Sequence, residues 1–193
     1  IEEIFRKPLA LSHVPSYHRR LPHRYTIGVP VFVTWRLAGS LPEGRVFPVQ
    51  ETAGRAFVQM DRLLDEAGTG PRFLHRDDTA SIVVEALWHR DNRMHAYKLH
   101  SYAVMPNHIH LLMTPTIDLP EIMRSLKRHT AREANRLLGR TGRFWQEESY
   151  DHLVRNRTEF RRISDYISRN PAAASLVAPG EQCPYAWRDP EIV

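Results

Sequence analysis

The sequence predicts an α+β fold in which helices pack on an antiparallel sheet. Segments with apolar residues at helical spacing alternate with short segments rich in β-branched and aromatic residues. Two of the expected strands, 96–105 and 108–114, follow each other directly and are separated only by the turn residues Pro106 and Asn107. Such neighbours pair as antiparallel strands, and this indicates the sheet type.

The first half of the chain has an irregular start, one strand and two helices. Residues 1–28 contain three prolines and are expected to be irregular. Val31–Leu37 is β-branched and aromatic, which predicts a strand. Helical apolar spacing predicts helices over 52–67 and 78–89, and Gly68-Thr69-Gly70-Pro71 ends the first of them.

The second half adds a helix over 119–138, an aromatic extended segment over 142–153 and a last helix over 156–170. Asn156 and Glu159 have the spacing of a capping box at the start of that last helix. Pro171 is expected to end it, because proline disfavours helical geometry at the preceding residue. The segment from 172 onward is expected to be loop-rich.

Length and composition indicate one main domain. The chain has 193 residues, of which 42% are hydrophobic, and this is enough for a sizeable core. The net charge of +5 favours polyanionic partners, with nucleic acid first. Cys183 is the single cysteine and there is no apolar run of 18 residues, so we expect a reducing, cytoplasmic location and no membrane span.

His108 and His110 alternate with apolar residues just after the Pro106-Asn107 turn. On a strand, residues two apart share a face, so the two imidazoles would lie side by side and could start a metal site. The spacing alone is close to what 11 histidines in a chain of this length produce by chance. Two polar residues on a solvent-facing strand therefore remain an equal alternative.

A basic stripe is predicted along the helical segment 119–142. Its arginines are spaced by four, which turns the helix by about 400° and keeps them on one face: Arg124, Arg128, Arg132, Arg136 and Arg140. Glu121 and Glu133 are the only acidic residues in this segment. The stripe suits phosphate contacts, although most charge runs are simply solvated. Trp145 nearby could stack on unpaired bases or could pack in the core.

Tyr166 and Asn170 lie four residues apart and therefore on one face of the last helix. Tyr166 is beside the apolar stripe of that helix and could reach a cleft against the sheet. A packing tyrosine with its hydroxyl in water is the ordinary alternative.

These segments together resemble a known family, the single-tyrosine HUH transposases of the IS200-like type, and within it the REP-associated tyrosine transposases. The resemblance rests on motif blocks that occur in this order: Met105-Pro106-Asn107-His108-Ile109-His110-Leu111-Leu112, Phe144-Trp145-Gln146, Tyr150-Asp151-His152, Asp165-Tyr166-Ile167 and Asn170-Pro171. It covers roughly residues 25 to 188.

The resemblance implies a ferredoxin-like fold and a DNA transposase that cuts and rejoins single strands through a 5′-phosphotyrosine. Tyr166 matches the nucleophile, His108 and His110 the metal ligands, and Asn170 the position of a third ligand. The metal would be Mg²⁺ or Mn²⁺, and the partner single-stranded or hairpin DNA, bound by a monomer or a homodimer. The expected organisation is a basic N-terminal extension, a catalytic domain and a C-terminal tail, over 1–24, 25–178 and 179–193.

DNA contacts are expected from the basic stripe, the aromatic segment and the last helix. The predicted set is Arg124, Lys127, Arg128, Arg132, Arg143, Trp145, Gln146, Arg155, Arg161 and Arg162. Tyr150 is a rival nucleophile. Two other readings stay open: a nucleic-acid-binding relative that has lost catalysis, and a metallohydrolase. The latter would need a carboxylate near the histidines, and Asp118 is the nearest downstream acid.

Overall fold

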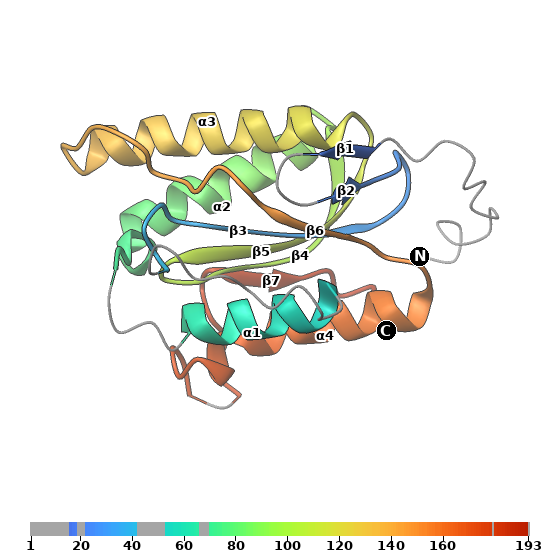
Figure 1. Ribbon diagram of the computed structural model, residues 1–193. Helices are drawn as coiled ribbons and strands as arrows, with labels where there is room; N and C mark the ends of the chain where they lie inside the picture. Colours follow the sequence, from blue (N-terminus) through green and yellow to red (C-terminus); the bar gives the residue numbers. More distant parts are fainter. Residues whose placement is uncertain (1–15, 19–21, 42–52, 66–69, 179, 193) are drawn as a thin grey trace.

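The computed structural model describes the chain except for residues 1–15, 19–21, 42–52, 66–69, 179 and 193. Its centre is a five-stranded antiparallel sheet with helices on both faces (Figure 1). The strands of this sheet are β3 (Val31–Arg36), β4 (Tyr97–Val104), β5 (His108–Pro115), β6 (Tyr150–Leu153) and β7 (Ala186–Arg188). The helices are α1 (Ala53–Asp65), η2 (Phe73–His75), α2 (Asp77–Asn92), α3 (Leu119–Leu137) and α4 (Arg157–Ala173). A separate two-stranded sheet joins β1 (Ser16–His18) and β2 (Pro22–Arg24).

The strand order confirms the ferredoxin-like arrangement. The chain runs β3, α2, β4, β5, α3, β6, and the strands lie in the order β6-β3-β5-β4-β7. The first four positions of this order are those of the βαββαβ unit. Helix α2 connects β3 to β4, which lie on either side of β5, and α3 connects β5 to β6, which lie on either side of β3. An additional strand, β7, then extends the sheet beyond β4.

The two faces of the sheet carry two different cores. Helices α2 and α3 cover one face, while α1 and α4 cover the other (Figure 1). Strand β5 is buried on both sides, and its side chains alternate between the cores. Ile109 and Leu111 pack with the α2 and α3 core, whereas Leu112 packs with Phe160 and Ile167 of α4. The two histidines of β5 alternate with Ile109 and Leu111, so they belong to the α1 and α4 face.

Two local expectations were wrong. Residues 16–18 and 22–24 form strands within the segment expected to be irregular. Strand β7 is a short strand in the segment expected to be loop-rich. Helix α4 also continues through Pro171 to Ala173. A proline in the last turn removes only one amide donor, and the carbonyl of Asn170 still accepts from the Ala174 amide at 2.9 Å. The boundaries at 24 and 178 between extension, domain and tail stay a prediction.

The start of α4 is capped by Asn156, as its spacing predicts. The Asn156 side chain accepts a hydrogen bond from the Glu159 amide at 2.9 Å, and the Glu159 carboxylate accepts from the Arg155 amide at 2.8 Å. We expect Asn156→Ala to lower the free energy of unfolding by about 1 kcal/mol, because one amide of the first turn loses its acceptor. Urea denaturation measures this, and an unchanged midpoint would show that water replaces the cap.

Candidate functional site

His108 and His110 lie side by side in the interior of the protein. Strand β3 pairs with β5 so that Arg36 is opposite His108 and Thr34 is opposite His110. Both histidine side chains are 0% exposed, and their Nε2 atoms lie 3.0 Å apart. The predicted pairing of the two rings on one face is therefore present, and the solvent-facing alternative is excluded.

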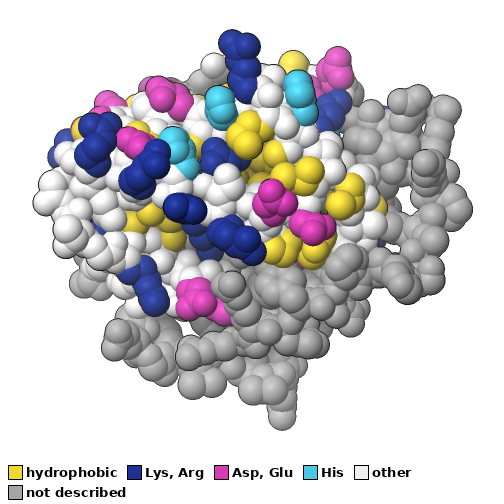
Figure 2. Space-filling model, turned by 90° about the horizontal axis from the view of Figure 1, so that it is seen from above, with side chains coloured by type: hydrophobic (Ala, Val, Ile, Leu, Met, Phe, Trp, Pro, Cys, Tyr) yellow, Lys and Arg dark blue, Asp and Glu magenta, His cyan; other side chains and the backbone are white. Residues whose placement is uncertain are grey.

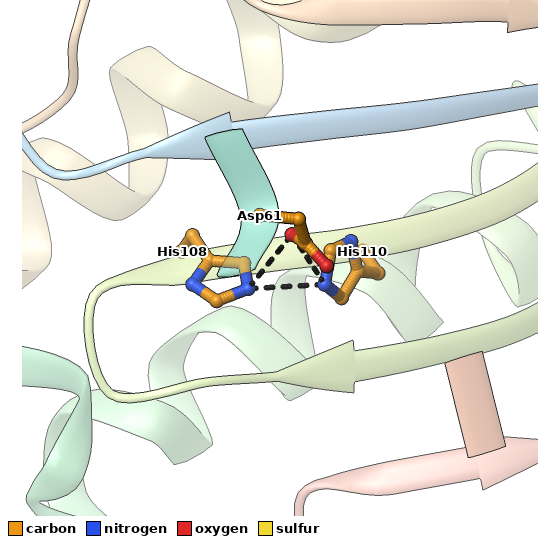
Figure 3. Close-up of side chains that lie close together, drawn as sticks. All are labelled: Asp61, His108 and His110. Atoms are coloured by element: carbon orange, nitrogen blue, oxygen red, sulfur yellow. Dashed lines mark hydrogen bonds and ion pairs between the residues drawn. The ribbon is translucent and has the colours of Figure 1, made fainter. Parts of the chain in front are cut away.

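A carboxylate that the sequence analysis missed completes the cluster. Asp61 of α1 places Oδ1 at 3.4 Å from Nε2 of His108 and at 3.3 Å from Nε2 of His110 (Figure 3). Asp61 is 2% exposed. Within the described part of the chain, these three residues form the one group of histidine, cysteine and acidic side chains close enough to share an ion.

The spacing and the chemistry of this cluster fit a divalent metal ion. Donors bound to one ion at about 2.1 Å lie about 3.0 to 3.4 Å apart, as Nε2, Nε2 and Oδ1 do here. The Nδ1 atom of His108 lies 2.7 Å from Oδ1 of Asn107, and Nδ1 of His110 lies 2.9 Å from Oγ1 of Thr34. These partners occupy the outer nitrogens and leave both Nε2 atoms for the ion. Two histidines and one carboxylate are a common set for divalent transition metals.

Burial keeps the imidazoles neutral. Desolvation lowers the pKa of His110 to about 3 and, together with the neighbouring His110, lowers the pKa of His108 well below its usual value. A neutral imidazole keeps the lone pair that a metal needs. Burial has the opposite effect on the carboxyl group and raises the pKa of Asp61 to about 7. A proton and a metal ion would therefore compete for Asp61 near neutral pH.

The raised pKa of Asp61 predicts a pH dependence of stability. The carboxyl group has a pKa of 3.8 in the unfolded chain and about 7 in the folded protein, so the folded protein binds this proton more tightly. Its contribution to the free energy of unfolding is fully present below pH 3.8 and is lost as the pH rises through 7. We expect Asp61→Asn to remove the dependence. In metal-free buffer the variant should gain about 3 kcal/mol relative to the wild type between pH 5 and pH 8. Urea denaturation at both pH values measures this, and parallel changes in the two proteins would contradict it.

Helix α4 brings Tyr166 and Asn170 to the same cluster. The Tyr166 ring packs edge-on against His110, with 5.6 Å between the ring centroids. Asn170 is 3% exposed, and its Nδ2 lies 3.4 Å from Oδ2 of Asp61. Its contact is thus with the carboxylate, and its role as a metal ligand stays a prediction. The rival Tyr150 lies against Phe32, with 6.3 Å between the ring centroids, and burial raises its pKa to about 12.

A basic groove lies on the other face of the sheet, between α3 and the segment 142–149. It has a volume of about 480 Å³. Figure 2 shows Lys and Arg side chains distributed over the face of the molecule on which α2 and α3 lie. Six residues of the predicted DNA-binding set line the groove: Arg124, Lys127, Arg128, Arg143, Trp145 and Gln146.

The other predicted DNA contacts lie elsewhere. Arg132 pairs with Glu133 at 2.9 Å on the exposed side of α3. Arg155 precedes α4, and Arg161 and Arg162 lie in its first half. The helical stripe is also shorter than expected, because α3 ends at Leu137. Arg140 instead stacks on the ring of Phe73, 4.5 Å from its centroid.

Trp145 packs mainly in the core. It is 5% exposed, its Nε1 donates to Oγ1 of Thr130 at 2.9 Å, and its ring lies edge-on to Trp35. The packing alternative for this residue is therefore present in the structure. Lys127 is held at the groove as well, since its Nζ donates to the carbonyls of Gln146 and Glu147 at 3.2 and 3.0 Å.

None of the described helices combines the length and the apolar character of a membrane span.

No curated protein matches the chain. A solved structure of a REP-associated tyrosine transposase bound to a REP hairpin is similar, with 19% identity, a TM-score of 0.45 and coverage of 91% of this chain and 92% of that one. The sequence profile described as "Transposase IS200 like" matches residues 74–170. This range includes His108, His110, Tyr166 and Asn170 and begins after α1, so Asp61 lies outside it. Because the match spans half of the chain, the protein belongs to the family of IS200-like transposases.

Proposed function

We propose that the protein is a metal-dependent transposase that cuts and rejoins single-stranded, hairpin-forming DNA through a 5′-phosphotyrosine. The observation that supports this best is the contact of the Tyr166 ring with His110, in a cluster where Asp61 also meets both histidines. One chain supplies the nucleophile and the metal donors together. This supports action as a monomer, and a homodimer remains the alternative for a sizing experiment.

Tyr166 is the proposed nucleophile. Its Oη attacks the phosphorus of a phosphodiester, the bond from phosphorus to the 3′-oxygen breaks, and the phenol proton is replaced by the bond to phosphorus while the leaving 3′-oxygen gains a proton. The covalent phosphotyrosine keeps the phosphodiester free energy, so rejoining needs no nucleotide cofactor. A tyrosine with an ordinary pKa near 10 is a poor nucleophile at neutral pH, and this is why the reaction needs assistance.

His108, His110 and Asp61 are the residues that would hold Mg²⁺ or Mn²⁺, with Asn170 beside the carboxylate. The bound ion would polarise a non-bridging phosphate oxygen and so favour attack at phosphorus. Imidazole ligands favour Mn²⁺ over Mg²⁺. Phe32 packs edge-on against Tyr166 and stacks on His110, which keeps the phenol ring beside the metal donors.

A covalent adduct assay tests the proposal. The full chain is incubated with a labelled single-stranded hairpin oligonucleotide and Mn²⁺, and the products are separated under denaturing conditions. We expect a labelled band at the mass of protein plus DNA fragment, and no such band when EDTA replaces Mn²⁺. Binding without an adduct in Mn²⁺ would instead support the relative that has lost catalysis.

The carboxylate of Asp61 favours a second candidate, a metallohydrolase in which water attacks the phosphate. The sequence offered no acid near the histidines, and the structure places one within 3.4 Å of both rings. The same assay separates the two functions. Hydrolysis would release a cut oligonucleotide with a 5′-phosphate that is not attached to protein, whereas the tyrosine mechanism leaves the 5′ end on Tyr166.

The groove beside α3 is the proposed site for the phosphates of the DNA. Each phosphate contact that is lost lowers the slope of log K against log salt by about 0.7 for single strands. We expect the double variant Arg124→Ala/Arg128→Ala to lose about 1.4 of that slope in a fluorescence anisotropy titration. Arg76→Ala is a matched control. Arg76 is an exposed arginine outside the groove, and its Nη2 lies 2.7 Å from Oδ2 of Asp78. Equal slopes in the double variant and the control would remove the groove from the proposal.

A further inference from the structure

Asn107 connects two parts of the metal cluster that are far apart in the sequence. It is 3% exposed and lies in the turn between β4 and β5. Its Oδ1 is 2.7 Å from Nδ1 of His108, and its Nδ2 donates to the carbonyl of Leu64 in α1 at 2.8 Å. We propose that Asn107 is the positioning residue of this site, which directs the lone pair of His108 toward the ion and holds the end of α1 that carries Asp61. The inference rests on the proposed metal site.

The hydrogen bonds of Asn107 determine which nitrogen of His108 carries the proton. A backbone carbonyl can only accept, so the side-chain atom facing Leu64 must be the amide nitrogen. The amide oxygen then faces His108, and because this oxygen only accepts, Nδ1 of His108 must carry hydrogen. In a neutral imidazole the other nitrogen has none. Nε2 of His108 therefore presents its lone pair to Asp61 and His110.

The second hydrogen bond of Asn107 acts on Asp61. Leu64 follows Asp61 by three residues, in the last turn of α1, which ends at Asp65. The carbonyls of a last turn have no amide partner within their own helix, so each needs a partner from elsewhere. Asn107 supplies one for Leu64. The position of Asp61 over the two rings thus depends on a side chain that precedes His108 directly.

The backbone around Asn107 is itself held firmly. The amide of Leu37, at the end of β3, donates to the Asn107 carbonyl at 2.8 Å. The amide of Met105 donates to the carbonyl of His108 at 2.9 Å and closes the turn. These bonds place the Asn107 side chain on a rigid base, which is what a positioning residue requires.

The hydrogen bond at the outer nitrogen of His110 is of a different kind. Its Nδ1 faces the hydroxyl of Thr34 at 2.9 Å, and a hydroxyl can donate or accept. Thr34 therefore permits either proton position on His110, whereas Asn107 permits one on His108. This difference makes Asn107 the position where a substitution should change both the proton location and the geometry of the cluster.

Two variants separate the two roles. Asn107→Leu removes both hydrogen bonds and keeps the branched shape of the side chain. Asn107→Asp keeps an acceptor for Nδ1 of His108 and loses the donor to Leu64. Asn135→Leu is the matched control, because the Asn135 amide makes the same kind of bond, 2.9 Å to the carbonyl of Gly142, on the other face of the sheet.

The first readout is the proton position on His108 in the metal-free full chain, from long-range ¹H–¹⁵N spectra of the ring, assigned by comparison with His108→Ala. We expect hydrogen on Nδ1 in the wild type, in Asn107→Asp and in the control, and a mixture in Asn107→Leu. The second readout is Mn²⁺ affinity by electron paramagnetic resonance. Both Asn107 variants should bind Mn²⁺ about 10- to 100-fold more weakly, and the control should bind as the wild type does.

An Asn107→Leu protein with an unchanged proton position, or an Asn107→Asp protein with wild-type Mn²⁺ affinity, would overturn the inference. If Asn107→Leu does not fold, as shown by circular dichroism, the affinity of Asn107→Asp decides the outcome. Neither readout uses DNA. A wild type that fails to form a DNA adduct therefore counts against the proposed function, while the proton position still decides the role of Asn107.

Discussion

Replacing Tyr166 by phenylalanine is expected to abolish the covalent adduct with DNA, by at least about 1,000-fold in rate. Only the hydroxyl is removed, so the edge-on contacts of the ring with His110 and Phe32 remain. The variant should still bind Mn²⁺ and hairpin DNA with wild-type affinity, because the phenol oxygen is proposed only as the attacking atom and is needed for neither kind of binding. Time courses of adduct formation at saturating DNA and Mn²⁺ measure the effect.

Tyr150→Phe is the control for this experiment. Tyr150 also packs against Phe32, but its pKa is raised to about 12 by burial, which disfavours the phenolate. We expect this variant to form the adduct at a rate within a few-fold of the wild type. If Tyr150→Phe loses the adduct and Tyr166→Phe keeps it, the nucleophile is Tyr150 of β6 and not Tyr166 of α4.

The second large effect is expected at the proposed metal site of Asp61, His108 and His110. His108→Ala removes one of two imidazoles whose Nε2 atoms lie 3.0 Å apart and within 3.4 Å of Asp61. We expect Mn²⁺ affinity to fall by more than about 100-fold and adduct formation to fall with it, since two donors remain of three. Isothermal titration with Mn²⁺ and the adduct assay on the same preparation measure the two losses.

His100→Ala controls for the loss of a buried histidine as such. His100 is 0% exposed on the neighbouring strand β4, lies 2.7 Å from the hydroxyl of Thr114 and packs edge-on against Phe160. It has no part in the cluster of Asp61 and the two β5 histidines. The two variants should lose similar folding stability, and only His108→Ala should lose the metal. Equal Mn²⁺ affinity in both proteins would contradict a metal site at His108.

The parts of the site that a local pattern specifies could be predicted. The alternation of His108 and His110 with Ile109 and Leu111 requires both imidazoles to share a face, because side chains on a strand alternate. Tyr166 and Asn170 share a face because they are four residues apart on a helix. The ferredoxin-like order followed from the family motifs, since the spacing of elements alone was compatible with several α+β sandwiches.

The position of Asp61 could not be predicted from the sequence. It is 47 residues before His108 in the printed sequence, on a helix whose apolar spacing says which face is buried and not which part of the sheet it covers. An acidic residue on such a helix looks like any solvated charge. Strand β7 was missed for a related reason. Three residues that pair with the edge of β4 carry too little periodicity to indicate a strand.

The complete burial of the two imidazoles has a consequence for the timing of any reaction. In the proposed reaction a phosphate oxygen has to reach an ion held by these donors, and neither ring offers surface to a molecule in solvent. For the proposed reaction, part of the wall around the cluster would have to move before DNA reaches an ion held there. The observed rate is then the product of an opening equilibrium and a chemical step, and each 1.4 kcal/mol of opening free energy slows it about tenfold. DNA that binds the opened form more tightly acts as its own activator, so cutting would begin only where the DNA itself holds the site open.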